Sequence, residues 1–215
     1  TWSRPKDGED RTVPGDREEW LGAVLDRGSN MQERDKNHAC ILLWSCGNES
    51  FGGKDLYELS QMFRRRDPSR LVHYEGVRLD PRYPDTTDVH STMYHKPEKI
   101  EEYLQNDPVK PFINCEYIHA MGNSCGGMSL YNALEDKYPM YQGGFIWDYV
   151  DQGLKMKSPH GRTRMAFGGD WGDRPTDYQF IANGIVMSDR KLSPKAQEVR
   201  YLFQLADITP AQDGV

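Results

Sequence analysis

Residues 111–123, P-F-I-N-C-E-Y-I-H-A-M-G-N, decide the expected fold. The stretch begins as a short apolar run behind a proline and turns polar at Glu116, Tyr117 and His119. Such a pattern is typical of a buried strand that ends at the rim of a sheet, where loops and ligands meet. It therefore places the carboxylate of Glu116 at a rim, and we expect the rest of the chain to place a second carboxylate opposite it.

Strands and helices are predicted to alternate at a spacing of roughly twenty to thirty residues, which is typical of repeated βα units. The expected strands are residues 40–44, 71–75, 88–94, the stretch from 111 onward and 143–151. The expected helices are residues 16–34, 54–66, a short one opened by Pro97, 126–138 and, after a long structured loop over 152–190, a closing helix over 194–205.

Five strands are too few for a closed barrel, which needs eight and typically about 250 residues. The chain is then either an open parallel sheet or the second part of a barrel without its first strands. No dinucleotide fingerprint or phosphate loop follows any of the strands, which removes the usual function of an open sheet. We therefore predict an α/β fold of the (β/α)₈ TIM-barrel type, truncated to about strands 4–8. Residues 1–205 would form this partial barrel, and residues 206–215 a linker or the start of a following domain.

Local patterns add three expectations about packing. Asp16 is expected to cap the first helix, and the uninterrupted apolar run over 40–44 predicts a strand buried on both faces. The helix over 126–138 should bury one flank, made of Leu130, Tyr131, Leu134 and Tyr138. The polar, turn-rich residues 1–16 favour an internal connection.

The composition excludes some classes of binding partner and indicates the cellular compartment. A net charge of −6 argues against nucleic acid and against anionic membranes. There is no apolar run near the length of a membrane span and no signal peptide at the start, so we expect a cytoplasmic protein. None of the four cysteines lies in a C-x-x-C pair, which argues against zinc, and Cys40, Cys46 and Cys115 are expected to be buried free thiols in a reducing compartment.

Functional side chains in such a sheet gather at the strand ends. Two glutamates from separate strands are the main equipment for cleaving a glycosidic bond, because one acid protonates the leaving oxygen while the other carboxylate attacks the sugar or activates water. A salt-bridged surface glutamate and a metal-dependent hydrolase on the same barrel are the competing interpretations. The polar and aromatic candidates at the strand ends are Asn48, Glu49, His73, Glu75, His90, Tyr94, Glu116, His119, Trp147, Asp148 and Asp151.

Five ordered motifs resemble those of glycoside hydrolase family 2, and specifically its β-galactosidases. They are G-N-E-S at 47–50, D-P-S-R-L-V-H-Y-E-G at 67–76, the stretch at 111–123, Y-Q-G-G-F-I-W-D-Y-V-D-Q-G-L at 141–154 and F-G-G-D-W-G-D-R-P-T-D-Y-Q-F-I-A-N-G at 167–184. The resemblance extends from about residue 16 to residue 205 and implies a (β/α)₈ barrel, of which these motifs would form the fourth to eighth strands.

The resemblance implies a retaining mechanism with Glu49 as general acid/base and Glu116 as nucleophile, which requires the shorter carboxylate gap of about 5 Å. The apolar run before Glu49 is expected to give it low-dielectric surroundings. Further roles follow for the remaining residues of the motifs: Asn48 on the sugar 2-hydroxyl, Tyr94 beside the nucleophile, His119 on the galactose, Trp147 in the pocket wall, and Phe180 with Asn183 at a sodium ion near the 6-hydroxyl.

Cofactors and partners also follow from the resemblance. Glu49 would help to bind magnesium, but the Glu-x-His pair that completes this site in the family does not precede it here, so the Mg²⁺ site would be incomplete. We expect a fragment that binds a β-galactoside only as part of a larger enzyme and that associates with itself or with the missing part. The alternatives are a β-glucuronidase or β-mannosidase of the same family, and a non-catalytic carbohydrate-binding or assembly module.

Overall fold

The computed structural model describes residues 12–206 and 208. The expectations for residues 1–11 and for most of the linker at 206–215 lie outside the described residues. The chain divides into two compact units, which we treat separately. Unit 1 runs up to Cys115 and includes Tyr138–Gly143, and unit 2 comprises Glu116–Lys137 and the chain from Gly144 onward.

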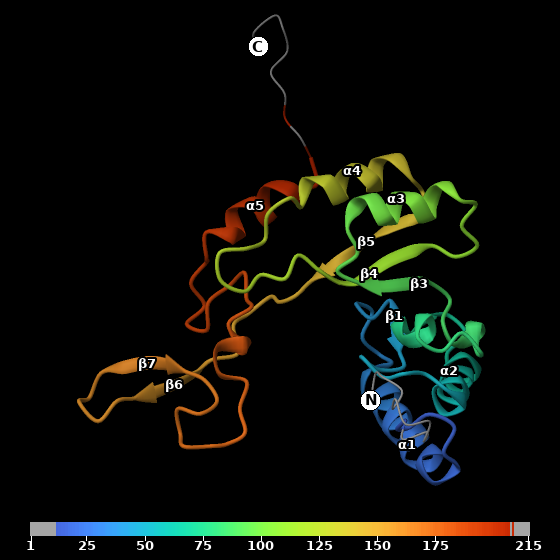
Figure 1. Cartoon of the computed structure of the whole chain (residues 1–215), viewed down its shortest axis with the longest axis horizontal. Helices are drawn as coiled ribbons and strands as arrows, with labels where there is room; N and C mark the ends of the chain where they lie inside the picture. Colours follow the sequence, from blue (N-terminus) through green and yellow to red (C-terminus); the bar gives the residue numbers. More distant parts are fainter. Residues whose placement is uncertain (1–11, 207, 209–215) are drawn as a thin grey trace, which may run out of the picture. The chain divides into compact units, whose positions relative to one another are not determined.

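Unit 1 contains most of the predicted βα repeats (Figure 1). Helix α1 spans Glu18–Asp35 and helix α2 spans Lys54–Arg66, as the apolar spacing predicts. Strands β1 (Leu43–Ser45) and β2 (Leu71–His73) pair in parallel, with Trp44 opposite Val72. Strand β3 (His90–Met93) and helix α3 (Pro97–Gln105) follow, and β3 lies beside β4 (Phe112–Tyr117), which lies beside β5 (Tyr141–Ile146) in a three-stranded sheet.

The core of unit 1 forms where α1 and α2 pack against β1 and β2. Trp44, Phe63 and Val72 are essentially inaccessible to solvent and belong to one cluster. Gly28 allows the helices to approach closely, because a Cβ there would lie 2.3 Å from the Cδ1 of Leu59. Gly28, although glycine is a poor helix former, thus serves the packing of α1 against α2.

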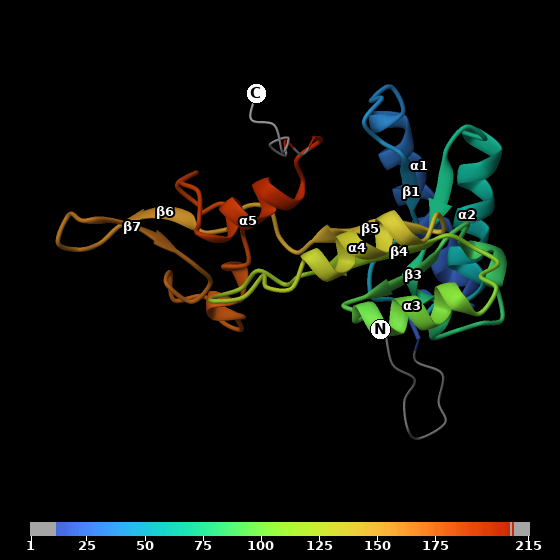
Figure 2. The ribbon, with the colours of Figure 1, turned by 90° about the horizontal axis from the view of Figure 1, so that it is seen from above.

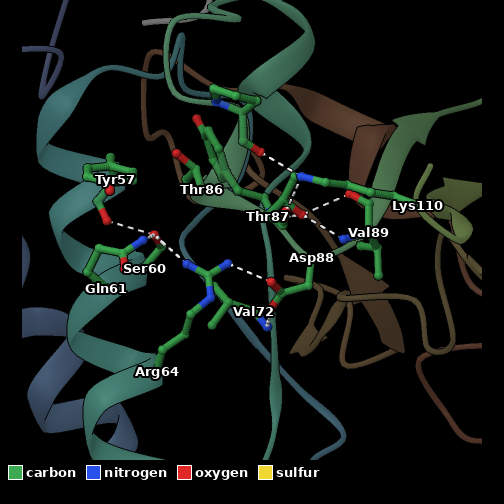
Figure 3. A network of polar contacts seen from close by, with 12 residues as sticks. Tyr57, Ser60, Gln61, Arg64, Val72, Thr86, Thr87, Asp88, Val89 and Lys110 are labelled. Carbon is green, nitrogen blue, oxygen red and sulfur yellow. Dashed lines mark hydrogen bonds and ion pairs between the residues drawn. The ribbon is translucent and has the colours of Figure 1, made fainter. Parts of the chain in front are cut away.

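Side chains connect β2 to the segment that leads into β3 (Figure 3). The Asp88 carboxylate accepts the backbone N–H of Val72 at 2.7 Å and pairs with Arg64 of α2 at 2.8 Å. The Thr87 hydroxyl accepts the backbone N–H of Tyr74 at 3.1 Å. These bonds satisfy backbone donors of β2 and its following residue where no regular ladder joins β2 to β3.

Unit 2 contains helix α4 (Ser129–Lys137), the antiparallel hairpin β6 (Leu154–Lys157) and β7 (Thr163–Ala166), and helix α5 (Lys195–Leu202) (Figure 2). One of its core clusters consists of smaller side chains than the core cluster of unit 1: Ala120, Cys125, Met128, Ile185, Val186 and Val199. The segment 152–190, which was predicted as a long structured loop, contains the hairpin β6–β7 and a short 3₁₀ turn, Tyr178–Ile181.

Two packing expectations are wrong. Asp16 does not cap α1, whose N-cap is Arg17; its carboxylate instead accepts the N–H of Lys54, the first residue of α2, at 2.6 Å. The run over 40–44 is not buried on both faces, since Leu42 is 75% exposed and the strand begins only at Leu43. An apolar run predicts that a segment is buried, but the elements that pack against the segment determine which of its side chains are covered.

The cysteines and α4 give further corrections. All four cysteines are free, which confirms the prediction of free thiols for Cys40, Cys46 and Cys115. Of these three only Cys46 is buried; Cys40 is exposed and Cys115 is partly exposed. In α4 the buried residues are Tyr131 and Leu134, whereas Leu130, which was expected on the same flank, is 56% exposed. Leu130 stands at the second residue of the helix, where it lies off the face that packs.

The described residues form sheets of two, three and two strands and do not close a barrel. Strands β1 to β5 with their helices keep the order expected for a partial (β/α)₈ barrel. Among the helices of the described part of the chain, none is long and apolar enough to cross a membrane.

Candidate active site

In unit 1, Asn48 and Glu49 lie on the loop that follows β1, and both are exposed. Glu49 adopts a φ of +51°, a left-handed conformation that few non-glycine residues take. The expectation that the preceding apolar run surrounds Glu49 is wrong for this chain, because Glu49 is exposed. Tyr94 follows β3 and is 40% exposed, also with a positive φ, of +54°.

The loop that carries Glu49 is bonded to the end of β2. The Glu75 carboxylate accepts the backbone N–H of Glu49 at 2.5 Å, and the Tyr74 hydroxyl donates to the carbonyl of Ser50 at 2.6 Å. Burial raises the pKa of Tyr74 above its usual range, with a further contribution from the charge of Glu75, so the hydroxyl stays protonated and able to donate. Glu75 and His73 were expected among the strand-end residues, but no sequence signal pointed to Tyr74 or to these contacts.

His73 connects three strands of unit 1. The Nδ1 of its ring lies 3.0 Å from the hydroxyl of Ser45 in β1, and the Nε2 lies 2.7 Å from the hydroxyl of Ser91 in β3. Burial lowers the pKa of His73 to about 4, so the imidazole is neutral at neutral pH. His73, which the sequence offered as a strand-end candidate, is thus a buried, hydrogen-bonded histidine.

In unit 2, segments distant in sequence bring the other predicted residues to neighbouring positions. Glu116 lies in β4 directly before Tyr117, whose carbonyl accepts the N–H of Trp147 at 3.1 Å. The Trp147 carbonyl in turn accepts the N–H of Ala120 at 2.7 Å. The rings of His119 and Phe180 lie 5.6 Å apart between their centroids. Glu116 and His119 are partly buried, and each has a further interaction within the chain.

Asn183 is the most buried residue of this group. Its carbonyl accepts the N–H of Asp148 at 2.8 Å, and its Nδ2 donates to the carbonyl of Phe180 at 2.5 Å. Asp151 supports the same turn by accepting the N–H of Gly184 at 2.7 Å, and a Cβ at Gly184 would lie 2.2 Å from the Asp151 nitrogen. The structure thus brings Trp147, Asn183 and Phe180 to one group of connected segments.

The residues predicted to bind metal ions, Asn183 in unit 2 and Glu49 in unit 1, differ in how well they suit an ion. The Oδ1 of Asn183 is buried without a hydrogen-bond partner, and oxygen atoms of this kind suit a hard monovalent cation. Within the residues that the structure describes, no group of three or more His, Cys, Asp or Glu side chains could hold a metal ion. Glu49 does not by itself fit magnesium, and a magnesium site there stays a prediction that depends on ligands beyond the described residues.

A cavity of about 480 Å³ in unit 1 is distinct from the predicted catalytic residues. It lies between the segments around Glu75, His90 and Lys110, and neither Glu49 nor Tyr94 lines it. Asn48, Glu49 and Tyr94 are thus exposed residues outside this cavity. The distance between Glu49 and Glu116, which belong to different units, stays a prediction.

Comparison with known proteins now identifies the class. Residues 4–208 match the family described as "Glycosyl hydrolases family 2, TIM barrel domain", and the chain belongs to this family. The solved structures that it resembles include Bacteroides uniformis β-glucuronidase 3, with a TM-score of 0.59 and 16% identity over 90% of this chain and 29% of that one. A β-glucuronidase of Faecalibacterium prausnitzii gives a TM-score of 0.55 at 21% identity, over 84% of this chain and 34% of that one. At these identities the likeness shows the fold.

More similar relatives are named β-galactosidases. The chain is 59% identical to one from Halalkalibacterium halodurans and 58% identical to one from Clostridium acetobutylicum, in each case over 94% of this chain. It is 50% identical to the β-galactosidase large subunit of Leuconostoc lactis over 90% of this chain and 31% of that protein. The chain spans 20% and 22% of the length of the first two relatives, so it corresponds to about a fifth of such a protein.

Proposed function

We propose that the chain is the part of a β-galactosidase that carries both catalytic carboxylates, and that the complete protein removes terminal non-reducing β-D-galactosyl groups with retention. The observation that carries the proposal is the group of neighbouring segments in unit 2, where Tyr117, the residue after Glu116, and Trp147 and Asn183 take part in backbone hydrogen bonds between residues far apart in sequence. Relatives named β-galactosidase at 58–59% identity support the galactosyl specificity.

In this mechanism Glu116 attacks the anomeric carbon as the bond to the leaving oxygen breaks, and Glu49 gives its proton to that oxygen. Water then attacks the galactosyl-enzyme ester while Glu49 accepts a proton from it, which releases galactose and restores both carboxyl groups. Asn48 would bond the 2-hydroxyl, a contact that strengthens in the oxocarbenium-like transition state, and Tyr94 would hold Glu116 ionised.

Unit 2 supplies the residues proposed to recognise the sugar. His119 would contact the galactose, and Trp147 would form part of the pocket wall. The carbonyl of Phe180 and the buried Oδ1 of Asn183 would hold a sodium ion, with the Oδ1 free of a hydrogen-bond partner in the structure. Such an ion would supply positive charge near the sugar 6-hydroxyl. No step is assigned to magnesium, because the described residues do not form a site for it.

The partners belong to the same proposal. Catalysis would require the segments of the protein that the relatives have beyond this fifth of their length. The present chain, as a separate polypeptide, would be inactive and would associate with itself or with those segments, because unpaired strand edges bind other strands. Residues 206–215 would lead toward a following part of the protein.

The proposal is tested with Glu116→Gln and Glu49→Gln in a complete protein that carries this chain. Each carboxamide keeps the shape but removes the nucleophile or the proton donor. We expect turnover of an aryl β-galactoside to fall by roughly three orders of magnitude or more for Glu116→Gln. Aryl β-glucuronides and β-mannosides serve as comparison substrates. Activity that survives the change at Glu116, or preference for a glucuronide, would contradict the assignment.

A further inference from the structure

The two residues that follow β2 bond the Glu49 loop at consecutive positions. Glu75 accepts the N–H of Glu49 itself, and Tyr74 donates to the carbonyl of the next residue, Ser50. The two bonds thus hold the peptide that precedes Glu49 and the peptide that follows Ser50, on either side of the peptide that joins Glu49 to Ser50. Neither Tyr74, which is 1% exposed, nor Glu75, which is 2% exposed, is open enough to touch a sugar.

The backbone at this point requires such support. A non-glycine residue at a φ of +51° is strained and persists only where its surroundings hold it. Gly76 contributes through its missing side chain, because a Cβ there would lie 2.5 Å from the Ser50 carbonyl oxygen. The turn after β2 can therefore pack directly against the Glu49 loop, and the direction of the Cα–Cβ bond of Glu49 follows from that contact.

We propose that Tyr74 and Glu75 are positioning residues that aim the Glu49 carboxyl at the leaving-group oxygen of the glycoside. The inference rests on the proposed function, since it concerns the residue assigned there as acid/base. Tyr74 and Glu75 act only through the backbone of Glu49 and Ser50, and they exchange no proton with the substrate.

Misdirection of Glu49 has a specific chemical consequence. A general acid must come within about 2.6–3.2 Å of the atom that it protonates, and a misplacement of about 1 Å can lower the rate roughly 100-fold. Alkoxide leaving groups, such as the glucose of lactose, need that proton. A 2,4-dinitrophenolate leaves without it, so the first step on that substrate does not depend on where Glu49 points. A structural defect would instead slow both substrates alike.

The test compares these two substrates in a complete protein that carries the chain with Tyr74→Phe, Glu75→Ala or Glu75→Gln. For Glu75→Ala we expect kcat/KM on lactose to fall roughly 100-fold, and for Tyr74→Phe about tenfold. On 2,4-dinitrophenyl β-galactoside, kcat/KM should change less than about threefold. Glu75→Gln keeps an oxygen that can accept the N–H of Glu49, and it should restore most of the activity on lactose.

A matched control is available in the same unit. The Tyr103 hydroxyl donates to the carbonyl of Lys110 at 2.8 Å, so Tyr103→Phe deletes an equivalent hydroxyl-to-carbonyl bond away from Glu49. It should leave the ratio of the two kcat/KM values unchanged. If Glu75→Ala does not fold, Tyr74→Phe decides the question alone, because it removes only one oxygen atom.

The outcomes separate this inference from the proposed function. A selective loss on lactose supports the positioning role. Equal losses on both substrates, or a Tyr74→Phe protein that behaves like Tyr103→Phe, would overturn it. If Glu49→Gln and Glu116→Gln both keep full activity, the assignment of the catalytic carboxylates fails instead, whatever the positioning variants show.

Discussion

Units 1 and 2 carry different parts of the proposed site and are stabilised in different ways. Unit 1 buries large side chains such as Trp44 and Phe63 between two helices and a pair of strands. Unit 2 has one core cluster of smaller side chains, and it also buries the rings of Tyr117 and Tyr131. Its segments are joined by side-chain bonds to main-chain carbonyls, as where Asn132 donates to Leu202 at 2.9 Å and Lys195 donates to Ala120.

The proposed catalytic residues follow this division. In unit 1, Glu49, the proposed acid/base, stands on an exposed loop that is bonded to the buried residues Tyr74 and Glu75. In unit 2, Glu116, the proposed nucleophile, lies within a strand, and the residues proposed to recognise the sugar lie on segments that are joined by backbone hydrogen bonds. The comparison teaches that a rigid strand can present Glu116 directly, whereas Glu49 needs supporting residues because it lies beyond its strand.

The largest effect on the comparison is expected from Leu59→Ala in the core of unit 1. Leu59 is 4% exposed and packs where Gly28 brings α1 close to α2. Its truncation should leave a cavity and cost about 2–5 kcal/mol of local stability. Hydrogen exchange on a complete protein should show the loss in peptides from α1 and α2, while peptides from α4 and α5 keep their protection.

Leu130→Ala is the matched control, since it removes the same atoms from an exposed position on α4. It should change local stability by less than about 0.5 kcal/mol. Equal loss of protection in both units after Leu59→Ala would show that they unfold together and would break the comparison.

The next effect concerns pH and again separates the units. The pKa of His73 is about 4 in the folded chain, against about 6.5 for an unperturbed histidine. Between these values the unfolded chain binds more protons, so the contribution of His73 is complete above about pH 6.5 and is lost as the pH falls toward about 4. The full loss amounts to about 3 kcal/mol.

Hydrogen exchange of peptides from β1 and β2, corrected for the intrinsic rate at each pH, measures this dependence. His73→Gln removes the titrating group, so its stability should vary less over the same pH range. A variant whose slope equals that of the unchanged protein would show that another group, and not His73, controls the acid sensitivity of unit 1.

The smallest effect comes from ion pairs and sharpens the same contrast. In unit 1, Arg64 pairs with Asp88 at 2.8 Å, and Asp88 also satisfies the N–H of Val72 (Figure 3). Arg64→Met should cost about 1–2 kcal/mol in peptides from α2 and β2, because a partly buried carboxylate loses its cation. Hydrogen exchange again supplies the measurement.

Arg164→Met is the control in unit 2. Arg164 of β7 pairs with Asp170 at 2.8 Å, and Asp170 keeps the N–H of Phe167 at 2.9 Å. Arg164 is more exposed than Arg64, with 45% of its side chain accessible against 26%, so a smaller loss is expected in the hairpin. A loss in the hairpin as large as that for Arg64→Met would show that the two ion pairs contribute equally and would remove this contrast.

Sequence patterns predicted the elements well where burial and local signals agree. The bounds of α2 were predicted without error, and Pro97 marks the start of α3, because proline favours the first turn of a helix. The hairpin β6–β7 was missed although Leu154–Lys157 alternates between apolar and polar residues, because each strand has only four residues and most of them are exposed. The partner of Asp16 was also missed, because a capping side chain can reach a second helix that is distant in sequence.

The sequence by itself determined the family, the order of strands and helices, and the residues proposed for catalysis, because motifs and periodicity are local properties of the chain. Only the tertiary structure decided that Tyr74 and Glu75 hold the Glu49 loop, that His73 is a neutral connector, and that Asn183 keeps a buried oxygen without a partner. Those features depend on which groups meet after folding, and contacts between residues distant in sequence leave no periodic signal.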